Sequence, residues 1–285
     1  MSRRLKILLL GFGDIATRLT RQLSPEQYDV VGARRRPPED SGVTVLAADA
    51  CDVSQVTDLL RIGFDAVVVT MTPSQRSEQG YRDSYLRSIE TLLAASKKTG
   101  AQPFVLWVSS TGVYGQNSGE LVDEQSPTEP ANFSGQVLLQ AERLLQSSDL
   151  PNCIVRFSGI YGPGRQAMLR AVKEDKPLTS PFGWTNRIHS EDCVGVLAHL
   201  LDLYRRGEPL AQVYLASDDE PVMQWQLRAY LKELLGVESE PFNRVTIEET
   251  GKRCSNRLLK ESGYGLRYPD YRSGYTHEVN NQQEN

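Results

Sequence analysis

The sequence predicts an α/β protein built on a doubly wound parallel sheet, with a smaller lobe toward its carboxyl end. Through the first half of the chain, short apolar runs alternate with longer segments of helical period. That alternation is expected for β-α-β units. The runs contain few polar residues, which is typical of parallel strands covered by helices on both faces. A glycine-rich turn after the first run is the third indication of this fold class.

The strands and helices follow from these runs in chain order. We expect six strands, at Leu5–Leu10, Tyr28–Gly32, Val43–Leu46, Asp65–Thr70, Phe104–Ser109 and Cys153–Phe157. Apolar residues at helical spacing predict helices from Ile15 to Ser24-Pro25, and at Val53–Leu60, Tyr81–Lys98 and Gly135–Gln146. Right-handed crossovers between these strands then fix most of the topology.

The second half of the chain is less regular. Residues 1–157 are expected to form the sheet domain, and residues 158–274 a small substrate lobe with elements that return to the sheet. Within the lobe, apolar spacing predicts helices at Ser190–Leu203 and Met223–Leu235. Ligands of such sheets bind beyond the carboxyl ends of the strands, where this lobe should lie. From residue 275 to 285 few aliphatic residues remain, so we expect a disordered tail.

Composition narrows the class of partner. The 285 residues include 32 Lys plus Arg and 36 Asp plus Glu, for a net charge of -4. No global basic field therefore favours nucleic acid or an anionic membrane. The four cysteines are widely spaced, with no C-x-x-C pair, so we expect neither a zinc site nor a disulfide framework. A globular protein of the reducing cytoplasm, with no bound metal, fits best.

The glycine-rich turn has the sequence of a dinucleotide site. Gly11, Phe12, Gly13, Asp14, Ile15 and Ala16 read G-x-G-x-x-A between the first strand and the first helix. Gly11 would permit the tight turn, Gly13 the approach of a pyrophosphate, and Ala16 close packing of the helix, whose amides then face the anion. A purely structural glycine turn is the alternative. The strand-turn-helix context favours a Rossmann-type cofactor site.

The end of the second strand indicates which dinucleotide binds. NAD sites usually carry an acid there for the ribose 2′-hydroxyl, but this chain continues with Arg34, Arg35 and Arg36. Guanidinium groups suit a 2′-phosphate, so we predict NADP in preference to NAD, with Arg34 as the first contact and Arg35 as the second. A solvated surface turn formed by the three arginines is the alternative.

Further cofactor contacts are expected where later strands end. Ligands of this fold class bind at the carboxyl edge of the sheet. The residues that we assign there are Asp49, Thr70, Met71, Thr72 and Ser109.

Three later segments resemble the extended short-chain dehydrogenase/reductase family, the nucleotide-sugar epimerases and dehydratases. They are Ser109–Gly115, Arg156–Arg165 and Asn186–Asp192, and the resemblance covers residues 1 to about 274. The turn departs from the family's usual G-x-x-G-x-x-G, and the endings Ser255-Asn256-Arg257 and Leu266–Pro269 look more like an atypical bacterial branch. The resemblance implies a Rossmann-type fold, a nicotinamide cofactor and a small polar substrate, nucleotide sugar or phosphorylated. It also implies that a homodimer is possible.

The family's catalytic pair is missing. Relatives carry Tyr and, four residues later, Lys on one helical face, and these two act with a Ser or Thr from the fifth strand. Alignment through Glu142 places Ser134 at the Tyr position and Leu138 at the Lys position. Neither side chain can perform that proton transfer.

The resemblance leaves three catalytic candidates. Ser110 matches the family's Ser/Thr, with Thr111 beside it, although serines at a strand end commonly satisfy backbone amides instead. Tyr114 has a phenol with an ordinary pKa near ~10, so it would need a cationic neighbour to act as a base, and packing in the loop is the alternative.

The substrate-binding candidates lie in the predicted lobe. Arg165 and Arg187 could hold an anionic group, or be surface charges. His189 and Tyr161 belong to segments that the resemblance assigns to substrate binding; for His189 a structural role before a helix is the alternative. Ser190 is a plausible cap of that helix.

Two functions remain open: an NADP-dependent oxidoreductase of epimerase/dehydratase type, and a dinucleotide-binding sensor or scaffold that has lost catalysis.

Overall fold

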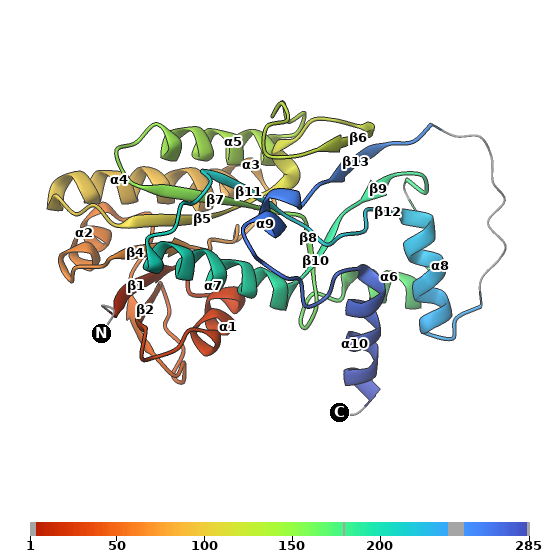
Figure 1. Ribbon diagram of the computed structural model, residues 1–285, viewed down its shortest axis with the longest axis horizontal. Coiled ribbons are helices and arrows are strands. Elements are labelled where there is room, and N and C mark those ends of the chain that lie inside the picture. The colour runs from red at the N-terminus through yellow and green to blue at the C-terminus, as the bar shows by residue number, and fades with distance from the viewer. Residues whose placement is uncertain (1–3, 179, 239–247, 284–285) are drawn as a thin grey trace. The chain divides into compact units, whose positions relative to one another are not determined.

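The computed structural model describes residues 4–178, 180–238 and 248–283. The fold class and the six predicted strands are confirmed, although several boundaries differ by one or two residues (Figure 1). A seven-stranded sheet runs in the order β11-β7-β5-β4-β1-β2-β3. Its strands are β1 (Leu5–Leu10), β2 (Tyr28–Arg34), β3 (Thr44–Ala47), β4 (Ala66–Val69), β5 (Phe104–Ser110), β7 (Asn152–Phe157) and β11 (Val213–Ala216).

The strand order places a switch point beside β1. β1 pairs in parallel with β2 on one side and with β4 on the other. Ligands of doubly wound sheets bind at the carboxyl ends of the two strands that flank such a point. Every residue of Ile7–Leu10 and Ala66–Val69 is fully buried, which explains why both strands read as unbroken apolar runs.

Helices cover both faces of this sheet. In Figure 1, one layer lies above the sheet and the other below it. The first layer contains α2 (Val53–Arg61), α4 (Arg87–Thr99) and α5 (Phe133–Gln146), and the second contains α1 (Asp14–Gln22) and α7 (Ser190–Arg206). Among the described residues, no helix is both long and apolar enough to cross a membrane.

The predicted helix Tyr81–Lys98 is three elements instead of one. A short helix α3 (Glu78–Tyr81) leads into a π-helical segment at Arg82–Leu86, and α4 follows. A π-helical turn holds one extra residue, and apolar spacing does not distinguish it from an α-helical turn. This segment is important below because it lines the candidate site.

The chain forms two compact units, each built from separate stretches. The first unit contains Met1–Val113, Thr128–Arg156 and Val194–Tyr214, and the second contains Tyr114–Pro127, Phe157–Cys193 and Leu215–Asn285. Residues 194–214 thus belong to the first unit, although they lie inside the range that the sequence assigns to the lobe.

In the described residues of the second unit, three small sheets combine with four helices. The strand pairs are β6 (Ser118–Val122) with β13 (Gly251–Cys254), β8 (Gly159–Tyr161) with β10 (Arg187–His189), and β9 (Trp184–Thr185) with β12 (Val222–Met223). The helices are α6 (Ala167–Lys173), α8 (Gln224–Leu234), α9 (Arg257–Glu261) and α10 (Tyr271–Gln283).

The prediction of a disordered tail from residue 275 is wrong through residue 283; residues 284 and 285 lie outside the described part of the chain. Helix α10 packs on the core of the second unit through Tyr271, Tyr275 and Val279. These three residues repeat every four positions, a helical spacing. Counting aliphatic residues alone overlooked the buried tyrosines.

Candidate functional site

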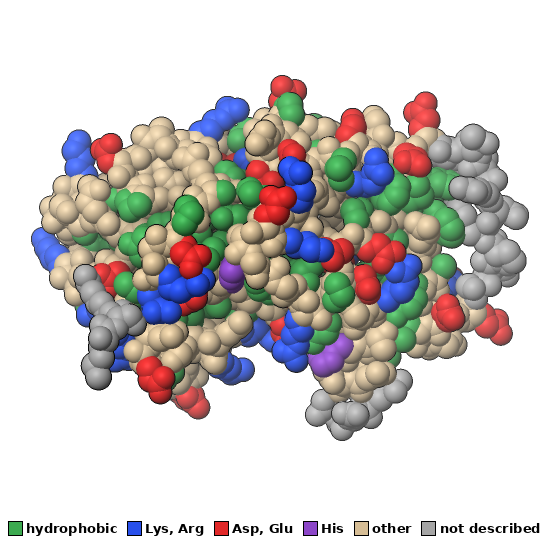
Figure 2. Space-filling model, viewed as in Figure 1, with side chains coloured by type: hydrophobic (Ala, Val, Ile, Leu, Met, Phe, Trp, Pro, Cys, Tyr) green, Lys and Arg blue, Asp and Glu red, His purple; other side chains and the backbone are tan. Residues whose placement is uncertain are grey.

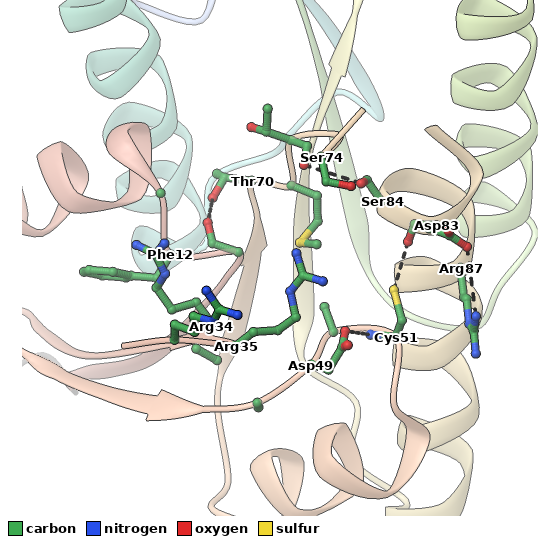
Figure 3. Close-up of a pocket in the computed structure, with 18 residues that line it drawn as sticks. Phe12, Arg34, Arg35, Asp49, Cys51, Thr70, Ser74, Asp83, Ser84 and Arg87 are labelled. Carbon is green, nitrogen blue, oxygen red and sulfur yellow. Dashed lines mark hydrogen bonds and ion pairs between the residues drawn. The ribbon is translucent and has the colours of Figure 1, made fainter. Parts of the chain in front are cut away.

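A cavity of about 660 Å³ opens in the first unit, at the carboxyl ends of β1, β2 and β4 (Figure 3). This is the place that the switch point predicts. Its lining comes from the glycine-rich turn, the arginine run, the loop after β3, the end of β4 and the π-helical segment. The lining residues are Gly11, Phe12, Gly13, Ala33, Arg34, Arg35, Arg36, Ala48, Asp49, Ala50, Cys51, Thr70, Met71, Thr72, Ser74, Asp83, Ser84 and Arg87.

The two glycines of the turn are required for different reasons. Gly11 has φ +90°, and a Cβ atom there would lie 2.7 Å from the Met71 sulfur. Gly13 has φ −107°, which any residue adopts, and a Cβ there would meet only the Gly11 carbonyl oxygen, at 3.8 Å. The protein itself therefore needs Gly11, whereas the space at Gly13 is left open toward the cavity. That open space fits a pyrophosphate approaching the start of α1.

The two glycines give a matched pair of variants. Gly11→Ala should destabilise the fold, because it strains the backbone and collides with Met71. Gly13→Ala should leave the melting temperature within ~2 °C of wild type, yet weaken dinucleotide binding by at least ~10-fold, because the methyl group occupies the anion's space. Thermal melting and fluorescence titration with NADPH measure the two effects. Equal dinucleotide affinity in Gly13→Ala and wild type would contradict this assignment.

The remaining residues of the turn support it from outside the cavity. The Phe12 ring is buried against Gly32, where it fills the place of a Cβ atom, so Phe12 offers only its backbone to the cavity. Ala16 is fully buried, as close packing of α1 requires. Asp14 points toward Arg18 and forms an ion pair of 2.7 Å with it. Asp14, Ile15 and Ala16 are not among the lining residues.

The arginine run ends β2 and borders the cavity. Arg34, Arg35 and Arg36 are exposed lining residues, and Figure 3 shows the first two side chains there. Within the part of the chain that the structure describes, none of the three forms an ion pair or a side-chain hydrogen bond. Three guanidinium groups at one cavity edge without carboxylate partners form a ready anion site.

The loop after β3 holds its own acid in a turn. Asp49 accepts a hydrogen bond at its Oδ1 from the Cys51 amide, at 2.9 Å. The Cys51 thiol in turn donates to the Asp83 carbonyl oxygen at 2.9 Å. Burial, and then the Asp49 charge, raise the pKa of Cys51 to about 11, so this cavity-lining cysteine is a neutral thiol.

The end of β4 is tied to the glycine turn. The Thr70 hydroxyl donates to the Gly11 carbonyl oxygen at 2.9 Å, and Met71 lies against Gly11. Thr72 accepts a hydrogen bond from Ser84 at its carbonyl oxygen, at 3.4 Å. The structure thus brings the predicted residues Thr70, Met71 and Thr72 to the cavity together.

Sequence reasoning missed the π-helical side of the cavity. Asp83, Ser84 and Arg87 line it, and the Arg87 guanidinium lies 4.0 Å from the Asp83 carboxylate. In the sequence these three residues are polar positions of a predicted amphipathic helix. Such positions are typical of a solvated helix face, so nothing in the sequence indicated a cavity.

Ser109 does not line the cavity. Its hydroxyl donates to Glu142 Oε1 at 2.6 Å, and the same carboxylate forms an ion pair with Arg156 at 2.6 Å. Glu142 and Arg156 are both buried. The three side chains form a buried clamp that joins β5, α5 and β7, and the bonding of the Ser109 hydroxyl supports a structural role rather than the predicted cofactor contact.

The catalytic candidates are not gathered in the cavity. Ser110 and Thr111 belong to the first unit but are not lining residues, and the Ser110 hydroxyl accepts from the Gly112 amide at 3.1 Å. That bond matches the alternative of a serine that satisfies a backbone amide. Tyr114 belongs to the second unit, where it is buried and its carbonyl oxygen accepts from the Lys252 ammonium at 3.0 Å.

The positions of the missing catalytic pair are structural. Leu138 is buried in the core under α5, and the Ser134 hydroxyl donates to Asn132 at 2.7 Å. Gly135 lies so close to the Gly112 carbonyl oxygen that a Cβ atom would approach it to 2.2 Å. The start of α5 is therefore fixed by packing.

Three of the four substrate candidates lie together in the second unit. Tyr161 and His189 are register partners of β8 and β10, and Arg187 begins β10. Arg165 lies in the following loop, where its amide donates to the Gly162 carbonyl oxygen at 2.9 Å.

His189 has both ring nitrogens engaged. Its Nδ1 accepts from the Glu191 amide at 3.3 Å, so Nε2 carries the proton toward Glu278 Oε1 at 3.1 Å. Ser190 does not cap α7, because its buried hydroxyl has no hydrogen-bond partner among the described residues. The His189 ring bonds to the first turn of α7 instead, which favours the structural alternative for this residue.

Comparison with known proteins agrees with this geometry. A family model described as NAD(P)H-binding matches residues 11–202, so the matched stretch begins at the first glycine of the turn. A solved structure described as a NAD-dependent epimerase/dehydratase from Methylobacillus flagellatus is 32% identical, with a TM-score of 0.86 over 99% of this chain and 100% of that one. The chain belongs to the NAD(P)-binding epimerase/dehydratase family.

Two further proteins are similar to this chain, one in sequence and one in fold. Protein YeeZ of Escherichia coli strain K12 is 28% identical over an alignment 282 residues long, which covers 93% of this chain and 97% of YeeZ. UDP-glucuronic acid 4-epimerase from Bacillus cereus, solved in complex with NAD, is 18% identical, with a TM-score of 0.78 over 98% of this chain and 99% of that one. The second likeness shows a shared fold. A nicotinamide dinucleotide is thus the cofactor class of this family, and the cavity of the first unit has the geometry to hold it.

Proposed function

We propose that this epimerase/dehydratase family member is an NADP-dependent oxidoreductase that acts on a small polar substrate, a nucleotide sugar or a phosphorylated compound. One observation carries the cofactor preference: Arg34, Arg35 and Arg36 border the cavity without carboxylate partners among the described residues. A guanidinium at this place suits a 2′-phosphate, whereas a 2′-hydroxyl needs an acceptor.

Different residues of the cavity would bind different parts of the cofactor. The open backbone at Gly13 and the first amides of α1 would receive the pyrophosphate, and Arg34 and Arg35 the 2′-phosphate. Asp49, already fixed by the Cys51 amide, offers its second carboxylate oxygen to donors of the cofactor. A bound nicotinamide supplies the hydride chemistry. Ser110 would orient the reacting hydroxyl of the substrate.

A sensor or scaffold is the second candidate function. Leu138 occupies the position of the family's lysine and is buried in the core, and the Ser110 hydroxyl is bonded to the Gly112 amide. These contacts favour a dinucleotide-binding protein without turnover. The four cysteines are free thiols, which supports a cytoplasmic location for either function.

The test of cofactor preference is Arg34→Ala. Loss of a charge-assisted contact of about 1.5–3 kcal/mol should weaken NADPH binding by roughly 10- to 100-fold. NADH affinity should change by less than about 2-fold, because NADH has no 2′-phosphate. Fluorescence titration measures both affinities, with the exposed Arg61→Ala as the control. Equal losses for the two cofactors would contradict the NADP assignment.

Turnover separates the two functions. NADPH oxidation is followed with a panel of sugar nucleotides and small carbonyl compounds. Oxidation with any member supports the enzyme, and tight NADPH binding without oxidation across the panel supports the sensor. If the protein binds no dinucleotide at all, both proposals fail.

A further inference from the structure

A group of buried polar side chains lies under α10 in the second unit. Four of them, Tyr161, Arg187, Asp218 and Tyr275, form what we call the donor cluster. Each has a buried side-chain N or O atom with no hydrogen-bond partner among the described residues: the two phenol oxygens, Arg187 Nε and Asp218 Oδ2. Buried polar atoms without partners are rare in native proteins and call for a ligand, water or a function.

Several contacts place the four side chains together. The Tyr161 and Tyr275 rings stack with their centroids 4.3 Å apart. The Asp218 amide donates to the Arg187 carbonyl oxygen at 2.7 Å. Asp218 and Arg187 both act electrostatically on Tyr275, and Asp218 also on Tyr161.

All four free atoms can donate a hydrogen bond. Phenols and the guanidinium Nε–H are donors. Burial raises the pKa of Asp218 to about 8, so near pH 7 it is mainly the neutral acid. Asp218 Oδ1 accepts from the Glu220 amide at 3.4 Å, which leaves Oδ2 to carry the proton. Each of the four atoms can therefore donate, and none of them bonds to an acceptor among the described residues.

The charged groups around the cluster already have partners. Asp270 accepts from the Ser273 amide, Glu220 pairs with Arg272, and Glu278 with His189. Asp192 accepts from the Tyr264 hydroxyl and from the Arg267 and Tyr268 amides. Among the described residues, Arg187 forms no ion pair and no side-chain hydrogen bond. Its positive charge is therefore the one left uncompensated beside the donors.

Helix α10 covers the cluster closely. The Tyr161 hydroxyl lies against Gly274, where it would be 1.8 Å from a Cβ atom, so only glycine fits. Tyr275 and Glu278 continue the same face of α10, which thus rests partly on polar side chains. Each buried donor left without a partner costs about 1–3 kcal/mol, which reduces the net stability of the covered state.

We propose that the donor cluster binds the oxyanion, carboxylate or phosphate, of a small ligand, and that α10 is a cover that moves aside to admit it. The ligand would be the substrate of the proposed oxidoreductase, so in that respect this inference rests on the proposed function. An oxyanion supplies the acceptors that all four side chains lack and balances the charge of Arg187. The contact between Gly274 and Tyr161 explains why the cover must move.

The test uses inorganic phosphate and acetate as probes, with the full-length chain. Arg34→Ala/Arg35→Ala is the parent protein, so that phosphate binding at these two arginines of the cofactor cavity is removed. Calorimetric titration should show saturable binding of at least one probe. Hydrogen exchange measured by mass spectrometry should show faster exchange across Tyr271–Gln283 when that probe is bound. Binding of phosphate alone would indicate a phosphate group on the ligand, and binding of acetate alone a carboxylate.

Variants in the same parent assign the site. Arg187→Met should weaken the probe's binding by at least about 10-fold, and Arg187→Lys should restore part of it. Asp218→Asn keeps a neutral donor and should bind within about 3-fold of the parent. Arg257→Met, an exposed arginine of α9 in the same unit, is the control. Thermal melting verifies that each variant is folded.

Three results would overturn the inference. They are no saturable binding of either probe, equal binding in Arg187→Met and the parent, and a crystal structure with the bound probe in which the cluster holds ordered water only. The proposed function is tested independently by titration of wild-type protein with NADPH, because the cofactor cavity is lined by residues of the first unit alone. If NADPH does not bind, the proposed function fails, whatever the result with phosphate and acetate.

Discussion

Glu142→Gln should lower the free energy of unfolding by about 3–5 kcal/mol, the largest effect expected of a single side chain here. Glu142 is fully buried and holds Arg156 through both carboxylate oxygens, while Ser109 donates to the same group. Glutamine keeps the shape but removes the negative charge that accepts these hydrogen bonds from the buried guanidinium. Denaturation in urea, followed by circular dichroism, measures the loss.

Replacement of the whole clamp distinguishes charge from packing. The triple variant Glu142→Leu/Arg156→Met/Ser109→Ala replaces all three side chains of the clamp, and an apolar replacement of a buried pair is often close to neutral. It should therefore recover most of the stability lost in Glu142→Gln. Asp58→Asn, which breaks an exposed ion pair with Arg61, is the control and should cost at most about 1 kcal/mol. A loss of that small size in Glu142→Gln would show that the clamp does not hold α5.

The stability of wild-type protein should fall as the pH rises from about 4 to about 8, because of Asp218. Burial raises the pKa of this carboxyl from its ordinary 3.8 to about 8. Between those values the folded chain keeps a proton that the unfolded chain releases. One such proton gives a slope approaching about 1.4 kcal/mol per pH unit. Above pH 8 both states are ionised, and this contribution becomes constant.

Asp218→Asn removes the slope. The amide is neutral at every pH, so the variant should match wild type near pH 4 and exceed it in stability at pH 7. Urea denaturation at pH 4, 6 and 8 compares the two profiles. Asp52 has the opposite pH dependence. Hydrogen bonds from the Gln55 and Ser54 backbone amides lower its pKa, so the contribution of Asp52 to folding stability is lost as the pH falls. Parallel profiles for Asp218→Asn and wild type would refute this account of Asp218.

The six predicted strands and the glycine turn were predictable because local signals decide them. Buried parallel strands such as Leu5–Leu10 read as apolar runs, and G-x-G-x-x-A requires only chain neighbours. The sequence did not reveal β11 (Val213–Ala216), because this strand returns to the sheet after a long excursion and has no partner nearby in the chain.

The part of the candidate site formed by strand ends was predictable from the sequence. The side-chain contacts between residues distant in the chain were not. Gly13, Arg34 and Thr70 line the cavity as expected, since strand ends converge there. Alternation along a strand could not show that the Ser109 hydroxyl bonds to a buried glutamate. Arg87 was missed because a π-helical turn changes which residues share a face.

The position of β11 has a consequence for how the chain acquires its fold. β11 is the edge strand next to β7, yet it is synthesised some sixty residues after β7 ends, when the stretch Phe157–Cys193 of the second unit already exists. Until residue 216 is available, the backbone edge of β7 is unpaired, and such edges recruit other chains. A fragment that ends at residue 157 therefore carries an open edge and is a poor domain to express alone. Completion of the sheet is a late, long-range step, which favours slow folding and dependence on chaperones during synthesis.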